Sequence, residues 1–162
     1  MRSVADFYQD CMAVAHALPP LDVQLADAVS CVLAEDVQAP FNLPVADLSA
    51  CDGYAVRIRD CEGATLESPV TLPVTEEIRA GAVDPAALVP GTAIRIASGA
   101  PMPSGAEAVV SLEFTDHGIA QVALRTAPAN GENIRRRAED VAQGDTVLRS
   151  GTRIGARQMA LL

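Results

Sequence analysis

The chain has 162 residues, a formal net charge of −9, 49% hydrophobic residues and 20% charged residues, which is the composition of a folded chain with an apolar core. Aromatic residues make up only 3%, so bases find few side chains to stack on, and the negative charge repels nucleic-acid phosphates. No apolar run approaches the roughly 20 residues that span a bilayer, and acidic residues near the N-terminus exclude a signal peptide, so we expect a cytoplasmic protein without nucleic-acid or membrane partners.

Two helices are expected at the N-terminus. Residues 3–18 place apolar side chains at helical spacing, with Ser3 as the N-cap and Pro19 and Pro20 ending the helix. His16 falls near the end of this helix, where the dipole favours a cation, so we assign it a structural role. A second helix is expected over residues 25–33, followed by a short extended piece near Val37.

The composition changes between residues 40 and 128, where short Val- and Thr-rich runs alternate with Gly and Pro. The expected strands are residues 54–58, 70–74, 92–97, 108–113 and 121–124. Five short strands with frequent turns predict a compact, barrel-like β module. After residue 130 a charged stretch leads to two further short strands and then to an apolar helix without a closing polar turn. From that uncapped ending we expect the front part of a longer protein.

The four cysteines form no CxxC pair and lie among apolar neighbours; they are Cys11, Cys31, Cys51 and Cys61. We therefore expect reduced, mostly buried thiols, with neither disulfides nor zinc. Cys51 precedes an aspartate and invites a catalytic role, but no neighbour in the sequence would activate its thiol, so we assign it a structural one.

Three segments carry residue types suited to chemistry. Residues 43–60 contain Asp47, Ser49 and Asp52; residues 91–113 contain the run Ser98-Gly99-Ala100-Pro101; residues 131–145 contain Arg135, Arg136 and Arg137 followed by Glu139 and Asp140. Each has a plain structural explanation when taken alone, as a turn, an ordinary loop and a solvated face of ion pairs.

Taken together, the three segments indicate a site for an anionic substrate. A hydroxyl and backbone amides at Ser98–Ala100 can hold an oxyanion, and arginine forks suit phosphate. Carboxylates beside an anion are unfavourable unless a hard divalent cation lies between them, as Mg²⁺ does in many phosphate sites. The pattern therefore predicts a metal-assisted reaction on a phosphate-bearing substrate.

The ordered segments "LAEDVQAPFNLPVADLSACDGYAVR", "IRAG", "PGTAIRIASGAPMPSGAEAVVSLE", "NIRRRAED" and "GTRI" resemble the N-terminal half of the molybdopterin molybdenumtransferase (MoeA) family. The same half occurs in the corresponding domain of gephyrin. The resemblance covers about residues 20–162, and its specificity lies in the order of the five motifs.

The resemblance implies a mainly β fold with a few helices, in which a small split helical and extended domain carries an inserted β domain. We expect the split domain at residues 1–42 plus 129–162 and the inserted domain at 43–128. From the resemblance we expect the family's α/β pterin-binding domain and C-terminal β domain to lie outside these 162 residues. The family works as a homodimer and inserts molybdate into adenylylated molybdopterin with Mg²⁺-dependent release of AMP. Its cleft is shared between subunits, so this chain alone is expected to be inactive.

The family's motif positions fall on Asp52, Ser98 and Asp140, which the resemblance implies are catalytic. Asp52 and Asp140 are the candidate metal ligands. Substrate binding is assigned to the remaining polar and loop positions of the three segments, namely Ser49, Gly99, Ala100, Arg135, Arg136 and Arg137. The chain departs from the family pattern at Leu48, Cys51 and Ala138, the last of which replaces a glycine.

Two other functions fit the same sequence. One is a non-enzymatic dimerisation or scaffold module of the gephyrin type. The other is a stand-alone β module that binds a different small anion. Substitution of Asp52, Ser98 and Asp140 separates the enzyme from the scaffold, and titration with molybdate, AMP and a pterin phosphate tests the anion module.

Overall fold

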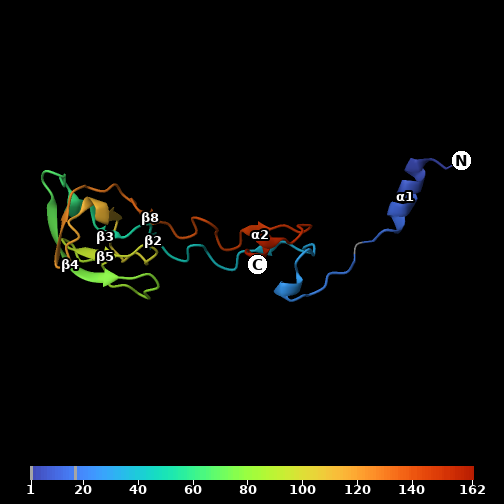
Figure 1. Ribbon diagram of the computed structural model, residues 1–162, viewed down its shortest axis with the longest axis horizontal. Helices are drawn as coiled ribbons and strands as arrows, with labels where there is room; N and C mark the ends of the chain where they lie inside the picture. The colour runs from blue at the N-terminus through green and yellow to red at the C-terminus, as the bar shows by residue number, and fades with distance from the viewer. Residues whose placement is uncertain (1, 17) are drawn as a thin grey trace. The chain divides into compact units, whose positions relative to one another are not determined.

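The computed structural model describes residues 2–16 and 18–162 (Figure 1). The chain divides into two compact units, one formed by Met1–Gln38 with Thr146–Leu162 and the other by Ala39–Asp145. The element order confirms the predicted mainly β class with a few helices. The inserted unit extends beyond the predicted residues 43–128 at both ends, and residues 39–43 pair there with residues 141–145.

The first helix, α1 (Val4–Val14), starts where the sequence predicts it to start. The Ser3 hydroxyl accepts a 3.1 Å bond from the amide of Asp6, whose carboxylate accepts a 3.2 Å bond from the amide of Ser3, forming a capping box. The helix ends four residues earlier than predicted, because Ala15 is extended, with φ −82° and ψ 119°. His16 therefore lies beyond the helix, and its predicted place in the last turn is wrong.

The predicted helix over residues 25–33 is also wrong. Only Leu25–Asp27 form a 3₁₀ turn, and Ser30 has a left-handed φ of 71° that stops any continuation. Residues 30–33 instead run antiparallel to residues 152–154, with a bridge between Val32 and Arg153.

The rest of this unit is short and extended. Strand β1 (Val37–Gln38) pairs with β9 (Thr146–Leu148), which confirms the extended piece near Val37. The described chain ends with the short helix α2 (Ala156–Met159). No helix in residues 2–16 or 18–162 has the length and apolarity needed to cross a membrane.

The inserted unit is built on a five-stranded sheet with the order β6-β3-β5-β4-β7. All five predicted strands are present, with ends that differ by a few residues; they are β3 (Gly53–Val56), β4 (Val70–Ile78), β5 (Ala93–Ile96), β6 (Ala108–Ser111) and β7 (Gln121–Leu124). A bridge joins Thr115, just after β6, to Leu124 at the end of β7. The two edges of the sheet thus approach each other and the sheet curls, as the barrel-like prediction requires.

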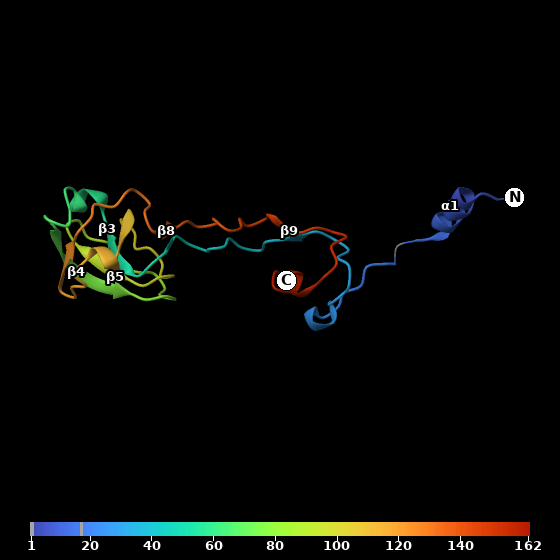
Figure 2. The ribbon, with the colours of Figure 1, turned by 45° about the horizontal axis from the view of Figure 1, so that its top comes forward.

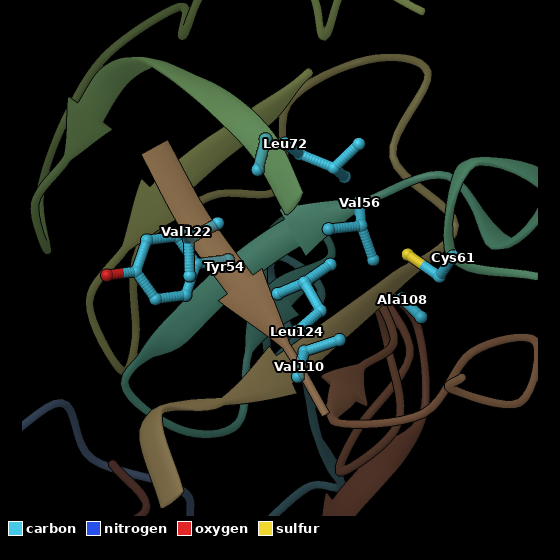
Figure 3. Packing of buried hydrophobic residues seen from close by; sticks show 9 residues of the cluster. Tyr54, Val56, Cys61, Leu72, Ala108, Val110, Val122 and Leu124 are labelled. Atoms are coloured by element: carbon cyan, nitrogen blue, oxygen red, sulfur yellow. The ribbon is translucent and has the colours of Figure 1, made fainter. Parts of the chain in front are cut away.

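Side chains alternate between two apolar clusters on the two faces of the sheet. The inner cluster is enclosed by the curl of the sheet, and Figure 3 shows β7 crossing over β3 beside its side chains. The largest members of this cluster are Tyr54, Val56, Val110, Val122 and Leu124. The outer cluster packs the loops around residues 88 and 97–106 onto β3, β5 and β6. The outer cluster therefore anchors the loop that carries Ser98.

A β-bulge in β4 changes which side chains face inward. Val74 pairs with Ala93 but Glu76 pairs with Ile94, so Thr75 is an extra residue. In a regular strand Leu72 and Ile78, which are six residues apart, would lie on the same face. Because of the bulge, Leu72 belongs to the inner cluster and Ile78 to the outer cluster. Glu77 consequently lies on the inner side, opposite Arg95 of β5.

A two-stranded ribbon leads away from the sheet within the inserted unit. Strand β2 (Leu48–Ser49) pairs antiparallel with β8 (Ile134–Arg135), and a bridge between Leu43 and Val141 extends the pairing. Figure 2 shows residues of these two segments running side by side, in agreement with Figure 1. The ribbon places the arginine segment beside residues 43–49.

All four cysteines are free thiols, of which Cys61 is buried and Cys51 is half-buried. Burial raises the pKa of Cys61 to about 11. Cys11 and Cys31 are exposed, so the prediction of mostly buried thiols is wrong for these two. The cause is that α1 buries no side chain and that the predicted second helix does not form.

Candidate functional site

Asp52 is bonded to a residue far away in sequence, and this contact defines the candidate site. The amide of Ser98 donates a 2.7 Å hydrogen bond to Oδ1 of Asp52, and the Ser98 hydroxyl donates a longer 3.3 Å bond to the carbonyl oxygen of Ala50. Asp52 and Ser98 are both exposed. The aspartate therefore cross-links two loops at the ends of β2 and β5, which a simple local turn would not require.

Gly53 explains the second half of the Asp-Gly pair. A Cβ at Gly53 would lie 2.2 Å from the carbonyl oxygen of Val110 on the neighbouring strand β6. Glycine is needed here for the close approach of two backbones, and Gly53 does not have a positive φ. The pair thus combines a cross-linking carboxylate with a strand contact that excludes any side chain.

The backbone amides of the Ser98–Ala100 loop are engaged within the protein. Ser98 donates to Asp52, Gly99 donates a 2.9 Å bond to the carbonyl of Ser49, and Ala100 donates a 3.0 Å bond to Ala97. These three amides therefore do not form the open anion-binding nest that the sequence pattern indicates. The exposed Ser98 hydroxyl is the polar side-chain group that this loop presents to solvent.

Ser49 has a structural position in the site. It is buried, and its hydroxyl donates a 2.6 Å bond to the carbonyl of Cys51 while its amide donates a 2.9 Å bond to Ala100. Burial raises the pKa of the Cys51 thiol, which opposes formation of the nucleophilic thiolate. The structural reading of Cys51 agrees with this environment.

The three arginines differ in what they contact. Arg135 forms a 2.5 Å ion pair with Asp140 and lies 3.5 Å from Glu139, and Arg136 forms a 2.8 Å ion pair with Asp47. The guanidinium of Arg137 has no ion pair or hydrogen bond within residues 2–16 and 18–162. Arg135 and Arg136 therefore brace the ribbon, and Arg137 keeps its fork free.

Asp47 accepts hydrogen bonds from two residues of the arginine segment, Arg136 and Arg137. Its Oδ1 accepts a 2.7 Å bond from the amide of Arg137 and its Oδ2 accepts a 2.8 Å bond from the Arg136 guanidinium. The bond from the Arg137 amide is the main reason that the pKa of Asp47 lies below its ordinary value, and Arg136 adds to the effect. The ionised Asp47 thus joins residues 43–49 to the arginine segment, and we call it an ionised brace.

Asp140 is not joined to the other two predicted catalytic residues. Its carboxylate pairs with Arg135, and its amide donates a 3.0 Å bond to the carbonyl of Leu43 on the ribbon. In the part of the chain that the structure describes, no hydrogen bond or ion pair links Asp140 to Asp52 or Ser98. The structure thus brings Asp52 and Ser98 together and leaves Asp140 on the ribbon, where its catalytic role stays a prediction.

A depression of about 170 Å³ lies beside Asp52, and its lining residues are Asp52, Gly53, Glu77, Arg95, Ile96, Ala97 and Leu112. Glu77 and Arg95 belong to none of the residues that the sequence analysis selects. The one feature of the sequence that marks Arg95 is its position between the apolar residues Ile94 and Ile96, which places it on the opposite face of the strand. Glu77 reaches the depression through the bulge at Thr75, for which the sequence carries no sign.

The residues present fit Mg²⁺ only as a partly hydrated ion. Among the described residues, no group of three or more His, Cys, Asp or Glu side chains is arranged to hold a metal. Mg²⁺ at substrate phosphates commonly takes one or two protein carboxylates and completes its shell with water and phosphate oxygens. Asp52 suits that role because it is exposed and only its Oδ1 accepts a bond from a described residue. Asp140 is already neutralised by Arg135.

The chain is similar to proteins of known family. The family model described as "MoeA N-terminal region (domain I and II)" matches residues 2–162. The chain is 50% identical over 151 residues to "Molybdopterin molybdenumtransferase 2" of Mycobacterium tuberculosis (strain ATCC 25618 / H37Rv), covering 93% of this chain and 37% of that protein. It is 40% identical over 144 residues to "Molybdopterin molybdenumtransferase" of Bacillus subtilis (strain 168), covering 86% of this chain and 34% of the relative.

A solved structure gives the same result. The crystal structure of the molybdopterin biosynthesis moeA protein from Pyrococcus horikoshii OT3 superposes with a TM-score of 0.80 at 38% sequence identity. The match covers 86% of this chain and 37% of that one. The chain therefore spans little more than a third of the length of these relatives.

Proposed function

Because the chain belongs to the MoeA family and matches its N-terminal region, we propose that it supplies one side of the active site of a molybdenum-inserting enzyme. The reaction that we propose is transfer of molybdate into adenylylated molybdopterin with release of AMP. The names of the relatives, which are molybdopterin molybdenumtransferases, support a transferase. The relatives' remaining length, outside the matched region, is where we place the pterin-binding side of the site.

The observation that carries the proposal is the hydrogen bond between the Ser98 amide and Asp52. It fixes one carboxylate oxygen of Asp52, the other accepts no bond from a described residue, and Ser98 is exposed. In the proposed reaction Asp52 holds Mg²⁺, which supplies positive charge against the substrate's phosphate and molybdate oxygens. The Ser98 hydroxyl exchanges its long bond to the Ala50 carbonyl for a hydrogen bond to a substrate oxygen, and Arg137 contributes a cation on the ribbon.

A homodimer and a site shared between subunits belong to the same proposal. They account for the exposure of Asp52 and Ser98 and for the open depression beside Asp52. The scaffold alternative gains no support from the relatives described above, since their names are those of transferases and of a molybdopterin biosynthesis protein.

A chimera tests the proposal. The matched region of the M. tuberculosis relative is replaced by this chain, and molybdenum insertion into adenylylated molybdopterin is measured by AMP release. Asp52→Asn is expected to lower turnover about 10- to 100-fold, the range found when groups supporting a metal site are lost. Ser98→Ala is expected to lower it less, about tenfold, and Ser98→Thr to restore it, because threonine keeps the hydroxyl.

Asp84→Asn is the matched control, because Asp84 is exposed and lies in a loop away from the depression. It is expected to leave turnover unchanged. Equal turnover in the Asp52→Asn and Asp84→Asn chimeras would refute the proposed role of this chain. The chain alone is expected to release no AMP, and robust release would contradict a shared site.

A further inference from the structure

Arg95 is a charged side chain on the inner side of the curled sheet. On β5, Ala93 belongs to the inner cluster, while Ile94 and Ile96 belong to the outer one, so Arg95 shares the inner side with Ala93. Its partner on β3 is Tyr54, a fully buried member of the inner cluster. Arg95 thus lies beside the inner cluster, and it is half-buried there.

The guanidinium of Arg95 has no ion pair or hydrogen bond within the described residues. Its register partner on β4 is Glu77, whose carboxylate pairs with Arg79 at 3.4 Å instead. Asp52, the other acidic residue of the depression, accepts from the Ser98 amide. A half-buried charge without a partner is unfavourable, so this position favours a ligand that brings negative charge.

Space for such a ligand exists beside Arg95. The depression of about 170 Å³ beside Asp52 and a neighbouring one of about 220 Å³ are both lined by Glu77 and Arg95. Either is several times the roughly 30 Å³ that one water molecule occupies in the liquid. A tetrahedral oxyanion fits in this volume and suits the planar fork of an arginine.

The nearby carboxylates decide when an anion binds. Asp52, Glu77 and Arg95 together carry one net negative formal charge, which disfavours an anion on its own. A divalent cation on Asp52 reverses that sign. We propose that Arg95 binds an oxyanion of the substrate, a phosphate or molybdate group, and that Mg²⁺ strengthens this binding. This inference rests on the proposed function and adds Arg95 to the residues that we assign to substrate binding.

The test is titration of the 162-residue chain, observed by ¹H–¹⁵N NMR at the amides of residues around the depression. The probes are sodium molybdate and inorganic phosphate, each with and without Mg²⁺. Because we expect weak binding, with a dissociation constant on the order of 1 mM, each probe is added up to about ten times that concentration. Saturable shifts at Ala97 and Leu112 are expected for at least one probe, and Mg²⁺ is expected to tighten binding. The two probes decide whether phosphate or molybdate is preferred.

Variants separate Arg95 from general electrostatics. Arg95→Gln is expected to weaken binding about tenfold or more, as for loss of a charge-assisted bond, and Arg95→Lys less. Arg59→Gln removes the same charge from an exposed turn after β3 and is expected to change binding less than twofold. Glu77→Gln is expected to have the opposite effect and to tighten binding in the absence of Mg²⁺.

Absence of saturable shifts with every probe, or equal weakening by Arg95→Gln and Arg59→Gln, would overturn the inference. Thermal unfolding of each variant identifies loss of fold, and Arg95→Lys with Glu77→Gln keeps the test decisive if Arg95→Gln unfolds. The two proposals fail separately. Loss of turnover in the Asp52→Asn chimera with no effect of Arg95 on oxyanion binding would reject only the role of Arg95.

Discussion

The amide of Ser98 donates a 2.7 Å hydrogen bond to Oδ1 of Asp52 across 46 positions of sequence. The bond ties the loop that follows β5 to the turn that precedes β3, two strands that are already antiparallel neighbours. It therefore orients a carboxylate whose position is set by the sheet and not by a flexible turn. Oδ1 of Asp52 is thus engaged in this cross-link, while Oδ2 is left for the ligand-binding role that we propose.

This division of labour predicts different stabilities for two substitutions at Asp52. Asp52→Asn keeps an oxygen that can accept from the Ser98 amide, whereas Asp52→Ala removes it. We expect Asp52→Ala to lower the free energy of unfolding by about 1 kcal/mol more than Asp52→Asn, the usual net value of one hydrogen bond. Urea unfolding of the chain measures the difference, and equal losses would show that the bond does not contribute to stability.

Gly53 is expected to be the least tolerant glycine of the sheet. Gly53→Ala would place a Cβ against the Val110 carbonyl, and overpacking of this kind costs about 1–3 kcal/mol. Gly155→Ala is the control, because its Cβ would meet only the flexible end of Gln158 at 3.3 Å. Thermal unfolding should show a large loss for Gly53→Ala and a small change for Gly155→Ala. A tolerated Gly53→Ala would mean that β3 and β6 separate easily.

Asp47 should make folding stability depend on pH. Its pKa is depressed by the Arg137 amide and by Arg136, so its contribution is present above the ordinary aspartate pKa of about 3.9 and is lost as the pH falls through the lower, folded value. Asp47→Asn is expected to cost about 1 kcal/mol near neutral pH, since the carboxylate is partly exposed.

The measurement is urea unfolding of the wild-type chain and Asp47→Asn at neutral pH and at about pH 2 to 3, below the ordinary aspartate pKa. The difference in unfolding free energy between them should shrink in acid. A difference that stays constant would contradict the assignment of Asp47 as an ionised brace. Asp22→Asn, an exposed aspartate near the N-terminus, controls for the change in net charge.

Ala138 carries backbone strain that glycine would relieve. It has a φ of 63°, a region that costs an L-residue about 1–2 kcal/mol, and it is the position where the sequence resemblance places a glycine. Ala138→Gly is expected to raise the free energy of unfolding by about 0.5–1 kcal/mol, after the entropic cost of glycine is subtracted. Ala142→Gly on the same ribbon, without a positive φ, should have the opposite sign.

The sequence predicts most of the inserted β unit because its strands alternate and are separated by Gly and Pro. Residues 121–124 illustrate this, since the predicted and observed strand agree at both ends. The helix predicted over residues 25–33 fails because apolar spacing there is matched equally well by pairing with residues 152–154, which no local signal reveals. Long-range pairing decided that segment, and propensity did not.

The candidate site is predictable only in part for a similar reason. Motif order leads to Asp52 and Ser98, whose contact the structure shows. Glu77 was inaccessible to sequence reasoning, because a single extra residue at Thr75 reverses the side of the sheet to which it belongs. The engagement of the Gly99 and Ala100 amides with backbone carbonyls is likewise a tertiary fact.

The two ends of the inserted unit lie next to each other. The amide of Ala39 donates a 2.9 Å hydrogen bond to the carbonyl of Asp145, and Gly144 returns a 2.9 Å bond to Ala39. Because the inserted unit begins and ends at neighbouring residues, it can be exchanged without altering the spacing of the flanking strands β1 and β9. Swapping residues 39–145 between homologues would therefore transfer the loop carrying Ser98 while leaving the host's own strand pairing undisturbed.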